Sequence, residues 1–334
     1  MPDIPCPFPF SVNPHVERAR AHLADWTRST ELISRPAARE RFERADFGWF
    51  AGLVYPTASP QRLDLMADWF AWLFLVDDQL DDGAFGRSPE RVAEAVGLMR
   101  AVLAGPGPVG RRELHHLPPA VASLADLWRR TAAGASPQWR HRFAVHLDQC
   151  LTTAATWEAD NRVHGRVPSE DSYITNRRHT GAIYVCMDLI EIVEDIDVPP
   201  ALYDSQSFRA ALDAACNVVC WVNDVYSLAK ERSLGEIHNL VHLVRHHRGL
   251  DDEQALREVC AAIGRETDRY LAAEARVVRE HPRQAEVLLP CLAGMRTWMR
   301  GNLDWSRRTE RYGPDASAER PETYLESTLM GTGQ

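Results

Sequence analysis

Two clusters of oxygen-bearing side chains stand out in the sequence because each follows an apolar segment. The first is the run of residues 77–82, Asp-Asp-Gln-Leu-Asp-Asp, which comes directly after the apolar residues 69–76 and before Gly83. A helix C-terminus carries partial negative charge, so aspartates that crowd there repel the helix dipole and one another unless a cation lies among them. A bound divalent metal is the simplest compensation, and we interpret this run as a metal site.

The second cluster consists of Asn223, Ser227 and Glu231, which recur at every fourth residue. At about 100° per residue, these three side chains fall on one face of a helix. An amide oxygen, a hydroxyl and a carboxylate together suit a hard cation such as Mg²⁺ or Mn²⁺, and they do not suit zinc. Two such sites in one chain predict a polyanionic ligand between them.

Helical geometry divides the roles of the four aspartates. Asp77 and Asp81 lie about 40° apart on one face of a helix, Asp78 borders that face and Asp82 points further round. We therefore expect Asp77 to bind metal, with Asp81 or Asp82 as the second ligand and Asp81 favoured by geometry. Asp78 is expected to pair with an arginine instead. The same face, traced back along the chain, carries an apolar stripe of Phe70, Leu73 and Phe74.

Basic groups must balance an anion that is held between two metal sites. Lys230 adjoins Glu231, and Arg311-Tyr312 closes the last expected helix. Arg177 lies shortly before Thr180-Gly181, which falls inside an otherwise helical run. A glycine in mid-helix costs about 1 kcal/mol relative to alanine, so it usually has a packing or functional reason. A helix break that exposes backbone groups to a ligand would be one such reason.

The elements that position these residues are all predicted to be helices, because apolar residues recur at helical spacing and sustained strand-like alternation is missing. Pro60 and Pro89 each mark a helix start. We expect one domain over residues 1–312, with a proline-rich arm at 1–15, a surface loop at 105–108 and a mobile or ligand-ordered tail at 313–334. The expected helices span residues 16–28, 38–55, 59–82, 88–104, 120–133, 137–163, 170–193, 207–232, 236–247, 252–281 and 283–311.

Composition excludes several classes of protein. The chain has 334 residues, a formal net charge of −9 and no long basic run, which argues against a nucleic-acid partner. Its 7 cysteines are scattered and never form a paired-cysteine metal or redox motif, as is typical of reduced thiols in a cytoplasmic protein. We expect neither a secretory signal nor a membrane span.

Taken together, these motifs resemble those of the class I terpene synthases, specifically the bacterial terpene cyclases. The run at 77–82 resembles the aspartate-rich motif of that family, and the residues from Asn223 to Glu231 resemble its Asn/Ser/Glu metal triad. Arg177 is similar to the arginine that senses diphosphate, with Thr180 and Gly181 at the positions called linker and effector. Thr180 departs from the aspartate that some members have. The pair Arg311-Tyr312 and the segment 157–162, Trp-Glu-Ala-Asp-Asn-Arg, also have counterparts in the family.

The resemblance implies a single-domain helical bundle around a central apolar cavity. It implies three Mg²⁺ ions (or Mn²⁺) that bind a prenyl diphosphate, most simply farnesyl diphosphate, which is ionised and cyclised to a sesquiterpene or its alcohol. The basic residues named above and Tyr312 would contact the diphosphate, and the Gly181 carbonyl would lie near it. An antiparallel homodimer would fit the family. The cation would be held by the aromatic faces of Phe70 or Phe74 and of Trp298 or Trp305.

Other interpretations remain open at this point. A diterpene cyclase that uses geranylgeranyl diphosphate would have much the same motifs. An isoprenyl transferase should carry a second Asp-Asp-x-x-Asp, which Asp251-Asp252 does not complete, and a non-catalytic prenyl-binding protein would not need both ligand sets. A zinc site of His238, His242 and His246 is disfavoured because no neighbouring residue completes a known zinc spacing.

Overall fold

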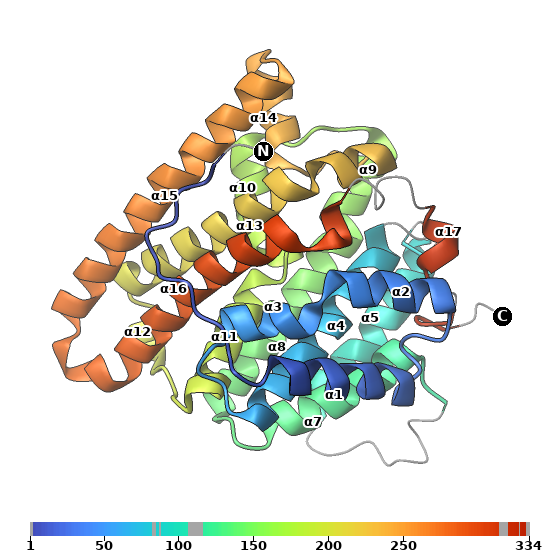
Figure 1. Ribbon diagram of the computed structural model, residues 1–334, viewed down its shortest axis with the longest axis horizontal. Helices are drawn as coiled ribbons and strands as arrows, with labels where there is room; N and C mark the ends of the chain where they lie inside the picture. Colours follow the sequence, from blue (N-terminus) through green and yellow to red (C-terminus); the bar gives the residue numbers. More distant parts are fainter. Residues whose placement is uncertain are drawn as a thin grey trace.

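The computed structural model describes residues 3–81, 85–86, 88–105, 116–313, 320–326 and 328–331. All regular elements within these ranges are helical, which confirms the all-α prediction (Figure 1). Asp82, the alternative metal ligand, and residues 106–108 of the expected surface loop lie outside the described ranges. Within those ranges we find no helix both long enough and apolar enough to span a bilayer.

Seven helices contribute side chains to a central cavity. The open side of the cavity lies toward the ends of α4 and α13. The closest packing within this group joins α13 to α16 and α16 to α3. The helices are α3 (Phe47–Val54), α4 (Pro60–Asp81), α8 (Pro137–Thr153), α10 (Glu170–Thr180), α11 (Ile183–Glu194), α13 (Gln206–Leu234) and α16 (Ala285–Arg308).

The remaining helices cover this group from outside. In Figure 1, α15 forms one edge of the molecule beside α13, whereas α1 and α2 lie at the opposite side near α3 and α4. The N-terminal arm runs along α15 and α16, where the Phe8 carbonyl accepts a hydrogen bond from Arg300 (3.0 Å). The outer helices are α1 (Val16–Ser29), α2 (Pro36–Ala45), α5 (Pro89–Ala104), α7 (Pro119–Ala132), α12 (Pro200–Tyr203), α14 (Leu240–Arg248), α15 (Asp252–Glu280) and α17 (Pro321–Tyr324).

Local interruptions divide three of the expected helices. The one predicted for 38–55 is broken at Asp46, which adopts the left-handed conformation (φ 54°) and caps α3 by accepting a hydrogen bond from the Trp49 amide. A π-helical turn at Ala154–Glu158 separates α8 from α9 (Ala159–His164). The helix expected over 170–193 is broken at Thr180-Gly181, because α10 ends at Thr180 and Ala182 is left-handed (φ 55°).

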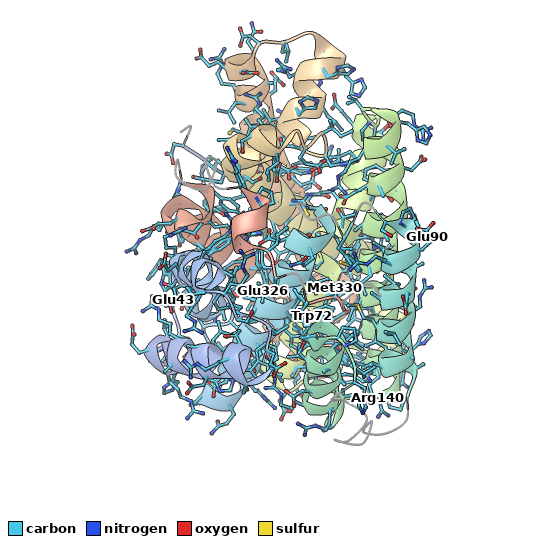
Figure 2. All side chains as sticks on the ribbon, turned by 90° about the vertical axis from the view of Figure 1, so that its right-hand side faces the viewer. Glu43, Trp72, Glu90, Arg140, Glu326 and Met330 are labelled. Carbon is cyan, nitrogen blue, oxygen red and sulfur yellow. The ribbon has the colours of Figure 1, made fainter. Side chains whose placement is uncertain are left out.

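The described part of the C-terminal tail packs against the body of the protein (Figure 2). The Glu326 carboxylate is 3% exposed and accepts hydrogen bonds from the Ser34 and Arg35 amides (2.7 and 2.8 Å), just before α2 begins. Its carbonyl accepts one from the Gln79 side chain (3.1 Å) at the end of α4. Leu329 is fully buried, and its carbonyl accepts from the Ala120 amide (3.0 Å). This segment therefore connects the starts of α2 and α7 with the end of the aspartate-bearing helix.

Candidate active site

The central cavity is walled mainly by apolar and aromatic side chains, as the stripe on α4 predicts. The space free of atoms is about 870 Å³ when the open solvent at its mouth is included. Phe70 and Phe74 on α4 and Trp298 on α16 line it, as expected. The remaining apolar wall comes from Phe50, Trp72, Leu73, Val76, Leu80, Leu151, Ala154, Ala182, Ile183 and Val219, with the thiols of Cys150, Cys186 and Cys220.

Trp305, named beside Trp298 among the cavity aromatics, does not line the cavity, because its ring lies behind the cavity wall. The indole stacks on Phe50 with ring centroids 4.2 Å apart, and it also packs against Phe74 (5.7 Å). Its Nε1 donates to the Ala45 carbonyl (2.8 Å). Trp305 follows Trp298 by seven residues, so it lies two turns further along α16. At that height Phe50 and Phe74 stand between it and the cavity, so its role is to support them.

The open side of the cavity is lined with charged and polar groups, and we call this region the polar mouth. It shares Phe74, Asp77, Arg177 and Asn223 with the apolar cavity, so the two are continuous. Its polar members are Asp77, Asp81, Glu158, Arg162, Arg177, Asn223, Ser227, Lys230, Glu231, Glu236, His238, Arg311 and Tyr312. The structure thus brings both predicted ligand clusters and all the predicted basic residues to one end of the cavity.

Asp77 and Asp78 are adjacent but have opposite surroundings. Asp78 is buried and accepts hydrogen bonds from Arg311 (2.7 and 3.0 Å), and Lys230 lies 3.4 Å from it. Burial alone would raise the pKa of Asp78, but these two cations hold that pKa well below its usual value. Asp78 therefore pairs with an arginine, as predicted. Arg311 and Lys230, expected at the diphosphate, also hold this aspartate in place.

Asp77 faces the cavity and the polar mouth. Burial, and then the neighbouring charge of Asp78, raise the pKa of Asp77 to about 7. Asp81, one turn further on, accepts a hydrogen bond from Arg162 (2.7 Å). Burial and the charge of Asp77 raise the pKa of Asp81 well above its usual value. Two carboxylates with raised pKa values in a shared mouth are a site where a divalent cation would stabilise the charged forms.

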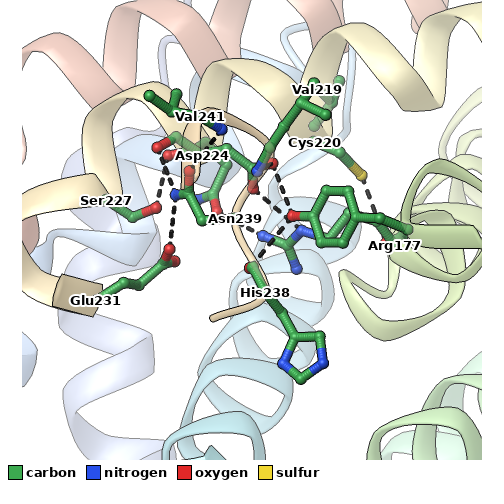
Figure 3. Close-up of polar contacts among 12 residues, drawn as sticks. Arg177, Val219, Cys220, Asp224, Ser227, Glu231, His238, Asn239 and Val241 are labelled. Carbon is green, nitrogen blue, oxygen red and sulfur yellow. Dashed lines mark hydrogen bonds and ion pairs between the residues drawn. The ribbon is translucent and has the colours of Figure 1, made fainter. Parts of the chain in front are cut away.

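The second cluster lies on the facing helix, α13. Asn223 donates from Nδ2 to the Tyr312 hydroxyl (2.7 Å) and accepts at Oδ1 from Arg177 (2.8 Å). The Ser227 hydroxyl donates to the Asn223 carbonyl (2.8 Å), and Glu231 accepts from Asn239 (2.7 Å), as Figure 3 shows for these last two residues. Burial, and then the charge of Asp224, raise the pKa of Glu231 to about 7.

Asp224 is a residue of the site that sequence reasoning missed. It is fully buried and accepts hydrogen bonds from Arg177 (3.2 Å), the Tyr173 hydroxyl (2.7 Å) and the Leu240 amide (3.0 Å) (Figure 3). It therefore ties α10, α13 and the start of α14 together and fixes the direction of Arg177. The signal in the sequence was its position beside Asn223, but its partners lie far away along the chain.

Gly181 fits closely beside Arg177. A Cβ atom at position 181 would lie 3.0 Å from the Arg177 carbonyl oxygen, 3.3 Å from Arg177 Nη1 and 3.5 Å from the Cys220 sulfur. The first of these distances is tighter than an ordinary contact, and its partner is backbone that cannot move easily. The mid-helix glycine predicted to have a functional reason thus leaves space for the guanidinium at the cavity wall. Thr180, at the linker position, also lines the cavity.

His238 does not share a helix face with His242 and His246, since it lies before α14 begins. Its Nδ1 is 2.6 Å from Glu236, and its Nε2 is 3.2 Å from the Asn161 amide. Both ring nitrogens therefore have partners in the protein. This arrangement agrees with the rejection of a zinc site on these histidines.

The donor chemistry of the mouth fits hard divalent cations. Among the residues that the structure describes, no three histidine, cysteine or acidic side chains gather closely enough to hold an ion by themselves. Mg²⁺ usually keeps several waters and binds through one or two carboxylates together with substrate phosphates. The side-chain oxygens that could hold such a cation belong to Asp77 and Asp81 on α4 and to Asn223, Ser227 and Glu231 on α13.

An all-helical bundle whose apolar cavity opens between an aspartate-rich helix end and an Asn/Ser/Glu helix face defines an enzyme of the class I terpenoid synthase type. The sequence agrees: residues 68–269 match the family described as terpene synthase family 2, C-terminal metal binding. Because this match covers more than half of the chain, the chain belongs to that family.

Relatives and solved structures cover nearly the whole chain. Pristinol synthase of Streptomyces pristinaespiralis is 33% identical over 92% of this chain and 83% of its own length. The (+)-T-muurolol synthase of Roseiflexus castenholzii, which cyclises (2E,6E)-farnesyl diphosphate, is 32% identical over 92% of each protein. The crystal structure of germacradien-4-ol synthase from Streptomyces citricolor superposes with a TM-score of 0.77 at 29% identity, covering 91% of this chain and 98% of that one.

Proposed function

We propose that this chain is a Mg²⁺-dependent carbon–oxygen lyase that ionises farnesyl diphosphate and cyclises the allylic cation to a sesquiterpene or a sesquiterpene alcohol. The observation that carries the proposal is the continuity of the apolar aromatic cavity with the polar mouth. A prenyl chain suits the apolar cavity, and a diphosphate with its cations suits the polar mouth. The similarity to an enzyme named for cyclising farnesyl diphosphate supports the C15 chain length.

The residues of the mouth would divide the work of ionisation. Asp77 and Asp81 would hold Mg²⁺ on one side, and Asn223, Ser227 and Glu231 on the other. When bound, Mg²⁺ neutralises diphosphate and makes it a better leaving group. Further hydrogen bonds and positive charge for the departing oxygens would come from Arg177, Lys230, Arg311 and Tyr312.

The cavity wall would then control the cation. Its apolar side chains exclude water, so the cation survives long enough to cyclise. The faces of Phe70, Phe74 and Trp298 offer negative electrostatic potential inside this enclosure, and a desolvated cation over an aromatic face gains about 2 kcal/mol. No carboxylate lies among the described residues of the apolar wall below Asp77, so the aromatic faces are the main source of negative potential there.

Product analysis tests the proposal directly. Purified protein is incubated with C10, C15 and C20 prenyl diphosphates, with Mg²⁺ or with EDTA, and both released diphosphate and extracted products are measured. We expect Mg²⁺-dependent release and a cyclic C15 product. Turnover of the C20 substrate alone would overturn the sesquiterpene assignment in favour of a diterpene cyclase. Binding without diphosphate release would indicate a prenyl-binding protein.

Single substitutions test the assigned ligands. Asn223→Ala should abolish diphosphate release and leave the helical circular dichroism unchanged, because Asn223 lies at the mouth and not in the core. Asp25→Asn is the control, since the Asp25 side chain is 77% exposed on α1 and pairs with Arg28. Full activity of Asn223→Ala would remove this residue from the metal site.

A further inference from the structure

The helix break between α10 and α11 lies in the wall of the cavity, and its carbonyl groups are only partly paired by backbone amides. Residues 180–183 all line the cavity. The last carbonyls of an α-helix have no partner within the helix and normally find other donors. The Gly181 amide donates to the Arg177 carbonyl (2.9 Å), but no backbone amide of the described residues donates to the carbonyl of Thr180.

Two cysteine thiols from other helices contact these carbonyls. The sulfur of Cys220 on α13 lies 3.6 Å from the Arg177 carbonyl oxygen (Figure 3), and the sulfur of Cys150 on α8 lies 3.8 Å from that of Thr180. A thiol is a weak hydrogen-bond donor. A Cβ atom at Gly181 would lie 3.5 Å from the Cys220 sulfur, so this thiol also packs directly on the break.

Both thiols keep their protons at neutral pH, so both can donate. Burial, and then the charge of Asp77, raise the pKa of Cys150 well above its usual value. Burial raises the pKa of Cys220 to about 12, although the charge of Arg177 opposes this rise. Thiols buried in apolar surroundings are chemically inert, which leaves a structural contact as the function of their protons.

Cys186 provides an internal comparison, because its thiol is also buried and also lines the cavity. Of the five buried thiols, only those of Cys150 and Cys220 contact a hydrogen-bond acceptor among the described residues. Both acceptors belong to the end of α10. The contacts therefore follow from the position of the break, and burial of a cysteine near the cavity does not by itself produce them.

The next carbonyl along the chain, that of Gly181, has no donor among the described residues. Because unpaired carbonyls are rare inside proteins, such a group at a cavity wall is an acceptor for a ligand. We propose that the thiols of Cys150 and Cys220 are positioning groups, which hold the break in the conformation that presents the Gly181 carbonyl to the substrate. This inference rests on the proposed function, since it assumes that a prenyl chain occupies the cavity.

Hydrogen–deuterium exchange of the peptide that spans the break, measured by mass spectrometry in EDTA, tests the proposal without turnover. Cys150→Ala and Cys220→Ala each remove one contacting thiol, and Cys186→Ala is the matched control. Loss of one hydrogen bond should speed exchange at the break by about two- to tenfold, whereas Cys186→Ala should change it by less than about twofold. Unchanged exchange in either test variant, or an equal rise in the control, would overturn the proposal.

Cys150→Val separates hydrogen bonding from packing. Valine fills the space that alanine leaves empty but has no proton to donate, so exchange at the break should stay fast. Slow exchange in Cys150→Val would show that the thiol acts by its volume alone, and it would overturn the proposal. If circular dichroism shows that Cys150→Ala does not fold, Cys150→Val takes its place with the same expected rise in exchange.

Turnover distinguishes a positioning role from a contribution to stability. With farnesyl diphosphate and Mg²⁺, Cys150→Ala should lower kcat by about two- to tenfold and increase the share of by-products, with KM changed by less than about twofold. Fast exchange at the break together with wild-type kcat and products would overturn the positioning role. Failure of the proposed function is a separate outcome, in which wild-type protein releases no diphosphate from any prenyl substrate while exchange at the break still responds to Cys150→Ala.

Discussion

Asp77 and Asp78 are neighbours in the sequence, yet their replacement by asparagine should change the stability of the metal-free protein in opposite directions. Asp78 is held by Arg311 and Lys230, so its charge is compensated. Asp77 has no hydrogen-bonded cation among the described residues, and its pKa is raised to about 7. Asp77→Asn removes an unfavourable charge, whereas Asp78→Asn removes the carboxylate that compensates the buried Arg311.

The magnitudes follow from the surroundings of each carboxylate. The pKa of Asp77 rises from 3.8 to about 7, about three units, and at 1.36 kcal/mol per unit this is an upper limit of about 4 kcal/mol. Because the carboxylate also faces the open mouth, we expect Asp77→Asn to gain about 1–3 kcal/mol. Arg311 is only 6% exposed, and breaking a buried pair on one side costs about 3–5 kcal/mol. We expect Asp78→Asn to lose about that much.

The dependence on pH supplies an internal control. A carboxyl group whose pKa is raised on folding binds protons more tightly in the folded state, so it lowers stability as pH rises from about 4 to about 7. The gain from Asp77→Asn should therefore be full at pH 8 and absent at pH 4. Asp78 has a lowered pKa, so its contribution is present above pH 4 and is lost only in stronger acid.

Urea denaturation of the two variants and the wild type, followed by circular dichroism at pH 8 in EDTA, gives these free energies of unfolding. Both variants should lose diphosphate release, so activity does not distinguish them and stability does. A destabilised Asp77→Asn protein at pH 8, or an Asp78→Asn protein as stable as the wild type, would refute the reasoning from local charge.

Three other predictions concern ligand binding, the pairing of His22 with Asp68, and the reactivity of the cysteines. Mg²⁺ together with inorganic diphosphate should stabilise the protein by about 2.7 kcal/mol at a hundredfold excess over Kd. This stabilisation should be seen as a higher melting temperature than in EDTA. An unchanged melting temperature would argue against a metal–diphosphate site. The pKa of His22 is raised, chiefly by its hydrogen bond to the buried Asp68. The stability lost in His22→Gln, measured by denaturation, should therefore be larger at pH 6 than at pH 9. Equal losses at the two pH values would contradict the pairing. Iodoacetamide at pH 8 should modify at most Cys6 and Cys260 in native protein, because the other five thiols are buried. Mass spectrometry identifies the modified residues. Rapid labelling of Cys220, whose pKa is raised to about 12, would show that the cavity opens.

The helical fold and both ligand clusters could be predicted because their signals are local. Apolar periodicity fixed the helices, and the four-residue spacing of Asn223, Ser227 and Glu231 placed them on one face of α13. The unusual position of Gly181 indicated the break after α10. Even the pairing of Asp78 with an arginine followed from the angle between adjacent helical residues.

The remaining features depend on groups that are distant along the chain. Nothing near Asp224 shows that Tyr173 and Arg177 bind it, and nothing near Asp81 indicates Arg162. The sequence does not show which of Trp298 and Trp305 lines the cavity, because Phe50 on another helix separates Trp305 from it. The π-helical turn before Ala159 is also set by tertiary packing, since the local sequence suits an uninterrupted helix equally well.

The unbroken 29-residue span of α13 has a consequence for how such an enzyme diversifies. Val219 and Cys220 line the cavity one turn before Asn223. The residues that would shape the product and the residues that would bind metal therefore lie on one continuous helix. Substitution of these two cavity residues changes the shape of the cavity and leaves the position of the metal-binding residues unchanged. Insertion or deletion of a single residue between Cys220 and Asn223 would rotate the rest of the helix by about 100°. The metal-binding residues of α13 would then no longer face their partners on α4 and α10. New products should therefore arise in this lineage by substitution at such positions, with the length of this helix held constant.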